Sequence, residues 1–311
     1  MPEGDIPLEA LRIGFIGAGR LGKALAWSFT QRGLRVAAVS STTPASAESL
    51  AAPIAGCTVA GVQGVVDACD IVFVTTPDGA IAASVAQARW RAGVAAVHCS
   101  GVTEVAALGK AAADGAMTGG FPPRQTFGDP AAAVRSMAGC TITIEAEEPL
   151  NATLVALAGR LQCDVNRLPP GMRGRYHAAA GYMSQFINAR LGEASKIWQT
   201  WGATEQEVVR ALLPMARGTL ASIESAGIAA GMPGPVSRGD VGSVAKHVTA
   251  LSAFDPETLE LYRQLCERTV ALALQRNAIA AETAVRLREV LQRPGDRGEH
   301  DGRGSQYPPV V

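Results

Sequence analysis

A glycine-rich turn follows the first apolar segment of the chain and constrains its fold more than any other feature. Residues 11–16 (LRIGFI) are mostly apolar, and the next six fit the spacing G-x-G-x-x-G: Gly17, Ala18, Gly19, Arg20, Leu21 and Gly22. In this pattern the first glycine permits a tight turn, the second lets a pyrophosphate approach the backbone, and the third lets a helix pack on the strand. The N–H groups at the start of that helix bind phosphate. The sequence therefore predicts a dinucleotide-binding βαβ unit.

The end of the second predicted strand (LRVAAVS) indicates which dinucleotide is bound. An NAD site usually has an acidic residue there, which holds the ribose 2′-hydroxyl. Here the chain has Ser40, Ser41 and Thr42, and the next acidic residue is Glu48. Hydroxyl groups together with Arg20 can accommodate a 2′-phosphate, so NADP is favoured over NAD. The alternative is that the hydroxyls only cap the next turn.

Apolar segments that alternate with helical ones indicate the fold class. CDIVFVTTP and GVAAVHCSG are predicted strands, and GCTITIEA and LQCDVNRLP are predicted to be later ones. Near-continuous apolar strands that alternate with helices are typical of a parallel sheet covered on both faces. We expect an α/β fold with a Rossmann-type doubly wound parallel sheet over residues 11–170, preceded by an N-terminal extension at 1–10.

Residues 171–293 are predicted to form an all-α domain for substrate binding or dimerisation. Thr204 begins a capping box before VVRALL, and Asp255 is expected to cap a helix that starts at Pro256. Pro214 is expected to kink or split its helix. Residues 294–311, rich in glycine, proline and charge, are predicted to be disordered.

Composition excludes several classes of partner. Lys and Arg number 28, as do Asp and Glu, and this zero net charge argues against nucleic acid and anionic membranes as partners. The six cysteines form no C-x-x-C pair, which indicates buried thiols rather than a disulfide framework or a metal site. The first ten residues do not resemble a signal peptide, and no apolar run approaches the roughly 20 residues of a membrane span. We expect a cytoplasmic protein.

Small and polar residues follow two of the predicted strands. Ligands of open α/β sheets bind beyond the carboxyl ends of strands, so these residues should line the nicotinamide side of the cofactor: Thr75, Thr76, Pro77 and Ser100. His98 lies within its strand and is interpreted as a core residue.

His177 is the candidate proton donor. If residues 175–198 form one helix, His177, Gly181, Ser184 and Asn188 share a narrow stripe of small and polar residues. Such a stripe lets a planar ring approach closely and offers it hydrogen bonds. A histidine near its usual pKa of about 6.5 can deliver a proton as hydride arrives. The alternative is a core histidine bonded to a backbone carbonyl.

The segment GPVSRGDVGSVAKH at 234–247 supplies three further candidates. Arg238 suits a substrate carboxylate because its planar fork binds carboxylates bidentately. Asp240 is expected to cap the helix that follows and to orient Arg238. His247 lies seven residues further, on the same helical face. The alternatives are a salt bridge for Arg238, a purely capping role for Asp240 and a core or interface position for His247.

Four segments in order behind the glycine turn resemble a known family: HCSGVTEVAALG, GAMTGGFPPRQTF, RYHAAAGYMSQF and GPVSRGDVGSVAKH. The chain is similar, over about residues 11–275, to Rossmann-like NADP oxidoreductases with a C-terminal helical domain of unknown function. Its layout resembles 6-phosphogluconate dehydrogenase and pyrroline-carboxylate reductase. Two departures concern the mechanism: Pro122 and Pro123 replace the family's His-Pro, and Gln185 stands where the family has Asn.

Three functions remain open at this stage. The first is an NADP-dependent oxidoreductase that acts on a small carboxylate-bearing oxo or imino compound in a cleft between the domains. The second passes hydride between NADP and a deazaflavin. The third is a non-catalytic NADP-binding or regulatory protein, which the missing family histidine motivates. By analogy with related helical domains, we also expect a homodimer.

Overall fold

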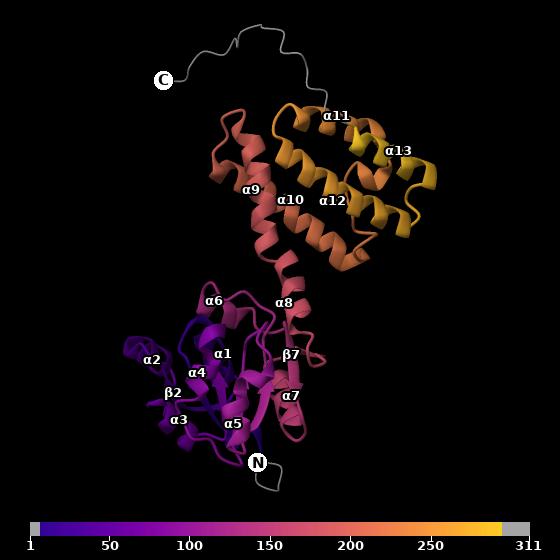
Figure 1. Cartoon of the computed structure of the whole chain (residues 1–311). Coiled ribbons are helices and arrows are strands. Elements are labelled where there is room, and N and C mark those ends of the chain that lie inside the picture. The colour runs from indigo at the N-terminus through magenta and orange to yellow at the C-terminus, as the bar shows by residue number, and fades with distance from the viewer. Residues whose placement is uncertain (1–6, 294–311) are drawn as a thin grey trace. The chain divides into compact units, whose positions relative to one another are not determined.

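The computed structural model describes residues 7–293, which form two compact units (Figure 1). The first unit ends at Tyr182 and the second begins at Met183. The predicted extension at 1–10 therefore lies partly outside the described residues, and the predicted disordered tail at 294–311 lies wholly outside them. Among the described helices, none combines the length and the apolar character that a membrane crossing requires.

The first unit contains an eight-stranded sheet in the order β3-β2-β1-β4-β5-β6-β7-β8. Its strands are β1 Arg12–Ile16, β2 Arg35–Ser40, β3 Thr58–Val59, β4 Ile71–Val74, β5 Ala95–His98, β6 Met117–Gly120, β7 Thr141–Ala146 and β8 Asp164–Arg167. Neighbouring strands are parallel except for β6 and β7, which pair antiparallel. The predicted α/β class is confirmed, with one reversal of strand direction within the sheet.

Helices cover both faces of this sheet because successive strand residues point to opposite sides. In β4, Ile71 and Phe73 enter one hydrophobic core, whereas Val72 and Val74 enter another. The first core includes residues of α1, α2 and α7, and the second includes residues of α3, α4 and α5. The helices of this unit are α1 Arg20–Gln31, α2 Pro44–Ala51, α3 Val62–Ala68, α4 Ile81–Val85, α5 Gly109–Ala113, α6 Pro130–Arg135, α7 Leu150–Arg160 and α8 Arg173–Tyr182.

The second unit is helical and has a single hydrophobic core among the described residues. Its helices are α9 Gln185–Gln199, α10 Glu205–Ala226, α11 Val241–Ser252, α12 Pro256–Gln275 and α13 Ala281–Gln292. The core is built from α11, α12, α13 and the 3-10 turn Val236–Arg238. The expected capping box at Thr204 and the expected caps at Asp240 and Asp255 are confirmed.

One local expectation was wrong. Residues 175–198 do not form one helix, because Ser184 has φ −126° and ψ −93° between α8 and α9. This break coincides with the division between the two units. Of the two outcomes expected at Pro214, a kink or a split, the split does not occur, since α10 continues through this residue.

The helix α8 belongs to the first unit, although we placed the end of the sheet domain at residue 170. Strand signals do end near that point, at β8. The side chain of Arg173, the first residue of α8, is nevertheless buried among strands of the sheet and holds the helix there.

Candidate functional site

The glycine turn connects β1 to α1 and is held by the ends of two neighbouring strands. Gly17 has φ +105°, a conformation that favours glycine, and its N–H donates to the Ser40 carbonyl at 2.8 Å. The Thr75 hydroxyl, at the end of β4, donates to the Gly17 carbonyl at 2.7 Å. A side chain at Gly22 would begin 2.6 Å from the Gly17 carbonyl oxygen and 2.7 Å from the Thr75 hydroxyl. The turn therefore requires glycine at positions 17 and 22.

Gly19 differs from the other two glycines because open space surrounds it. No heavy atom lies within 4 Å of the position a side chain would occupy, and α1 begins at the next residue without a side-chain cap. The Thr76 hydroxyl is buried and has no hydrogen-bond partner within residues 7–293. Unused donors beside open backbone fit a dinucleotide pyrophosphate. Ala18 and Leu21 pack with the core and can offer only backbone groups.

The side chains expected to bind the 2′-phosphate of NADP include three hydroxyl residues at the end of β2. Ser40 is buried, whereas Thr42 and Arg20 are exposed. The Ser41 hydroxyl accepts a hydrogen bond from the Thr43 N–H at 3.3 Å, which is the capping role considered as an alternative. No carboxylate follows β2 before Glu48. This end of the strand therefore presents hydroxyl groups rather than a carboxylate.

The hydroxyl of Ser100 forms its hydrogen bonds within the turn after β5. Its hydroxyl accepts from the N–H groups of Val102 and Thr103 and donates to the Thr103 hydroxyl at 2.9 Å. Pro77, after β4, is exposed. The Ser100 side chain thus shapes the loop at this edge, and its hydroxyl proton already has an acceptor.

His98 is a core residue, as its position within β5 indicated. It is wholly buried, and its Nδ1 accepts from the Ser100 N–H at 3.2 Å. Its Nε2 is buried without a partner in the described part of the chain. Burial, together with the nearby positive charge of Arg173, lowers the pKa of His98 to about 3. The imidazole is therefore neutral at physiological pH.

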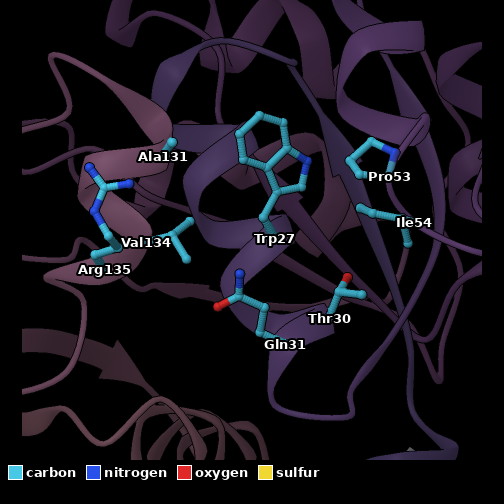
Figure 2. A pocket seen from close by; sticks show the side chains of 8 residues that line it. All are labelled: Trp27, Thr30, Gln31, Pro53, Ile54, Ala131, Val134 and Arg135. Atoms are coloured by element: carbon cyan, nitrogen blue, oxygen red, sulfur yellow. The ribbon is translucent and has the colours of Figure 1, made fainter.

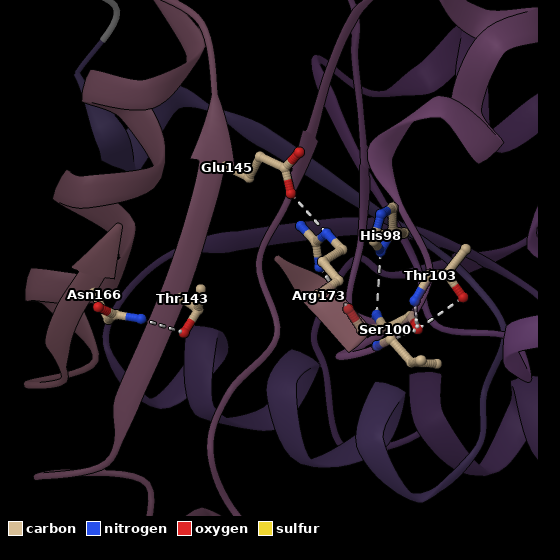
Figure 3. A network of polar contacts seen from close by, with 8 residues as sticks. His98, Ser100, Thr103, Thr143, Glu145, Asn166 and Arg173 are labelled. Carbon is tan, nitrogen blue, oxygen red and sulfur yellow. Dashed lines mark hydrogen bonds and ion pairs between the residues drawn. The ribbon is translucent and has the colours of Figure 1, made fainter. Parts of the chain in front are cut away.

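Arg173 is a buried cation that sequence reasoning missed (Figure 3). Its side chain is 0% exposed; Nε donates to Glu145 on β7 at 2.6 Å and Nη1 donates to the Ser100 carbonyl at 2.8 Å. The remaining nitrogen, Nη2, packs against Gly120, where any side chain would collide with it. Arg173 thus joins α8 to β7 and to the loop after β5. Nothing in the segment LPPGMRG signals that its arginine would be buried.

His177, one turn further along α8, lies beside Gly101. A side chain at Gly101 would begin 2.7 Å from His177 Nδ1. The imidazole is exposed, and no hydrogen bond joins it to another residue of the described chain. The interpretation as a core histidine bonded to a carbonyl therefore does not hold. His177 stands over the same loop whose carbonyl Arg173 binds, at the carboxyl end of β5.

Arg124 also contacts α8 and was missed. It follows Pro122 and Pro123, donates from Nη2 to the Tyr176 carbonyl at 3.0 Å, and places its guanidinium carbon 3.7 Å from the centre of the Tyr176 ring. This stacking is a cation–π contact. Its position in the segment FPPRQTF, which carries the family resemblance, was the available signal.

The remaining predicted residues belong to the second unit. Ser184 lies at the break before α9, and Arg238 is exposed at the end of its 3-10 turn. The oxygens of Asp240 accept from the N–H and hydroxyl of Ser243, and these bonds lower the pKa of Asp240. Asp240 therefore caps α11 but makes no hydrogen bond to Arg238. His247 Nδ1 lies 2.8 Å from the Tyr262 hydroxyl.

An apolar pocket of about 390 Å³ lies elsewhere in the first unit (Figure 2). Trp27 stands between Pro53 and Ile54 on one side and α6 on the other. The α1 residues that line this pocket, Trp27, Thr30 and Gln31, lie in the second half of the helix. The glycine turn lies at the other end of α1, where the helix begins. This pocket is therefore separate from the candidate site.

Two family models match parts of the chain. Residues 12–100 match the family described as "NADP oxidoreductase coenzyme F420-dependent", and residues 140–269 match "Domain of unknown function (DUF2520)". The two matches follow each other along the chain in the order expected from the sequence, and they confirm the predicted resemblance to NADP oxidoreductases with a C-terminal domain of unknown function. No curated protein matches the chain.

Several solved structures share the fold. A proposed NADP oxidoreductase of Bacteroides fragilis is 23% identical, with a TM-score of 0.67 over 85% of this chain and 100% of that one. A reductive aminase of Aspergillus terreus, solved with NADPH and ethyl-5-oxohexanoate, is 16% identical, with a TM-score of 0.57 over 90% and 92%. Pyrroline carboxylate reductase of Plasmodium falciparum, with NADP bound, is 11% identical, with a TM-score of 0.56 over 86% and 100%. At these identities the likeness establishes the fold.

Proposed function

We propose that the chain is an NADP-dependent oxidoreductase that transfers hydride to or from a small carboxylate-bearing oxo or imino compound. The observation that carries the proposal is the glycine turn. Neighbouring atoms fill the space that a side chain at Gly17 or Gly22 would need. The space beside Gly19 is free, and the N-terminus of α1 next to it has no side-chain cap. This combination fits the pyrophosphate of a dinucleotide.

The 2′-phosphate of NADP is proposed to bind at the end of β2. Arg20 is exposed and forms no ion pair within residues 7–293, and Ser41 and Thr42 supply hydroxyls. A carboxylate at this position would repel the phosphate, and the chain has none there. When bound, the nicotinamide supplies or accepts the hydride, and the residues of this chain hold the partners and move the proton.

His177 is proposed to move that proton. Reduction of a carbonyl or imine places negative charge on the oxygen or nitrogen as hydride reaches carbon, and the imidazolium of His177 donates a proton to that atom. In the reverse direction the neutral imidazole accepts it. General acid catalysis of this kind contributes roughly 10²–10⁴-fold. Arg238 is proposed to bind the substrate carboxylate, and Ser184, Asp240 and His247 remain proposed site residues.

Replacement of His177 tests this assignment. We expect His177→Asn to lower kcat by roughly 10²-fold or more, with the Kd for NADPH unchanged in a fluorescence titration. Arg175→Gln is a matched control, since Arg175 is exposed on the same helix. Unchanged kcat in the His177 variant removes it from the mechanism. Tight binding of NADPH without turnover on any oxo or imino acid supports a non-catalytic role instead.

Hydride exchange with a deazaflavin is a second candidate, because the model that matches residues 12–100 is described as coenzyme F420-dependent. That match covers the first part of the dinucleotide domain and does not reach α8. Transfer between two cofactors needs no protein acid. Turnover of NADPH with a deazaflavin that persists in the His177→Asn variant would therefore favour this candidate.

A homodimer formed through the helical unit is also proposed. The helices α9 and α10 lie outside the hydrophobic core of the second unit. Each has one buried residue, Ser195 in α9 and Val208 in α10. Val209 and Leu220, which lie on the same side of α10, are 37% and 45% exposed. A second copy would cover this apolar face. Leu220→Lys should shift the sedimentation equilibrium towards monomer, while an unchanged monomeric mass of the parent protein would exclude the dimer.

The cellular location is proposed to be the cytoplasm. All six cysteines are free thiols, which supports a reducing compartment.

A further inference from the structure

Two cysteines of the first unit face each other across neighbouring parallel strands. Cys140 directly precedes β7 and Cys163 directly precedes β8, where Thr141 pairs with Asp164. The Asp164 N–H donates to the Cys140 carbonyl at 3.0 Å, so the pairing already begins beside the two cysteines. Neighbouring strands lie about 4.8 Å apart, which is within the range of roughly 4.4–6.8 Å between the Cα atoms of disulfide-bonded residues. The backbone is thus compatible with a disulfide at this position.

The two sulfur atoms are already in contact. Sγ of Cys140 and Sγ of Cys163 are 3.4 Å apart. A disulfide bond is about 2.05 Å long, so modest side-chain rotations would close the gap. No other hydrogen bond joins two cysteines among the described residues, although all six cysteines lie within that part of the chain. The Cys140–Cys163 pair is therefore distinct from the other four thiols.

The hydrogen bond between the two thiols links their pKa values. It lowers the pKa of Cys140, and the backbone N–H of Arg124 acts in the same direction. The same thiol–thiol bond, together with burial, raises the pKa of Cys163. Cys140 and Cys163 are 9% and 8% exposed. Cys69, by contrast, is 0% exposed and lacks a thiol partner.

We propose that Cys140 and Cys163 are a modification site, a dithiol that a hydroperoxide oxidises reversibly to a disulfide between β7 and β8. The Cys140 thiolate attacks the terminal oxygen of the peroxide, the O–O bond breaks, and the leaving alkoxide or hydroxide takes up a proton. Cys140 is then a sulfenic acid. The sulfur of Cys163 attacks the sulfur of Cys140, the S–S bond forms, and hydroxide leaves with the Cys163 proton as water. Two thiols lose two electrons in total, and one peroxide gains them.

This dithiol adjoins the loop that contacts α8. The Arg124 N–H donates to the Thr141 carbonyl at 2.7 Å, and the Arg124 guanidinium binds Tyr176, the neighbour of His177. A disulfide would stiffen the strand pair on which this loop rests. The oxidation itself is independent of the proposed function, because it requires only the two thiols and a peroxide.

Titration of the full-length protein with hydrogen peroxide, followed by mass spectrometry under denaturing, non-reducing conditions, tests the proposal. We expect the loss of two of the six free thiols, a decrease in mass by two hydrogen atoms, and a cross-linked peptide pair containing Cys140 and Cys163. Dithiothreitol should restore both thiols. Cys57→Ser should give the same result, since Cys57 is a half-buried single thiol.

Two variants separate the roles of the thiols. In Cys163→Ser, Cys140 should accumulate as a sulfenic acid that dimedone traps. In Cys140→Ser, Cys163 should remain a thiol at the same peroxide concentration. The proposal is overturned if both cysteines can still be alkylated after Cys57 has been oxidised, or if the protein unfolded in urea forms this disulfide as fast as the folded protein.

Discussion

Arg173 of α8 donates from Nε to Oε2 of Glu145 on β7 at 2.6 Å, and the arginine side chain is completely buried. Removing one partner of a buried ion pair leaves an uncompensated charge, which costs about 3 kcal/mol or more. We expect Glu145→Ala to lower the free energy of unfolding by about that amount in urea denaturation. Glu147→Ala is the control, because Glu147 is exposed two residues further along, and it should change stability by less than about 0.5 kcal/mol. Equal effects would show that the ion pair does not anchor α8.

The pKa of His98 predicts an acid-dependent loss of stability. Because burial and the charge of Arg173 lower this pKa from 6.5 to about 3, the unfolded chain binds a proton between these pH values and the folded chain does not. Stability is unaffected above pH 6.5 and falls towards pH 3 by on the order of 1.4 kcal/mol per pH unit from this group. Urea titrations of His98→Asn should show a shallower decline between pH 6.5 and 4.5. Parallel declines in the two proteins would refute the assignment.

Two alanine substitutions in the glycine turn should differ in their effects. Gly22→Ala places a methyl group against the Gly17 carbonyl and Thr75, and should cost roughly 1–3 kcal/mol in stability. Gly19→Ala meets no atom within 4 Å, so it should leave the melting temperature unchanged. Its methyl group should nevertheless raise the Kd for NADPH about tenfold or more, a loss of ~1.4 kcal/mol. Unchanged affinity in Gly19→Ala would place the cofactor elsewhere.

Arg20 should distinguish NADPH from NADH. A charge-assisted contact with the 2′-phosphate contributes about 1.5–3 kcal/mol, so Arg20→Ala should weaken NADPH binding roughly 10–100-fold. NADH binding should not change, because NADH lacks that phosphate. Calorimetric titration with both coenzymes measures the difference. Equal losses for both would mean that Arg20 contacts a group common to the two.

Gly101 should affect turnover through His177. A methyl group at Gly101 would lie 2.7 Å from His177 Nδ1 and must displace the imidazole. Displacement of a catalytic group by about 1 Å can cost roughly 10²-fold in rate. We expect Gly101→Ala to lower kcat towards the value of His177→Asn, with a nearly normal Kd for NADPH. Combining the two substitutions should add little, whereas fully additive losses would show that the residues act separately.

The local features of this fold were predictable because they depend on neighbouring residues. The glycine turn needs only the spacing of Gly17, Gly19 and Gly22, and the caps at Thr204, Asp240 and Asp255 act on N–H groups two or three residues away. The break at Ser184 was not predictable in this way. Its residues favour a continuous helix, and the chain departs from the helix where one unit ends and the next begins.

By itself the sequence determined the fold class, the position of the dinucleotide turn and the helical character of the second half. Tertiary structure decided which side chains that are distant in the sequence meet. Arg173 is 28 residues from Glu145 and 73 from Ser100, and Cys140 is 23 residues from Cys163. The order and direction of the strands bring these residues together, and periodicity along the chain carries no information about pairing across a sheet.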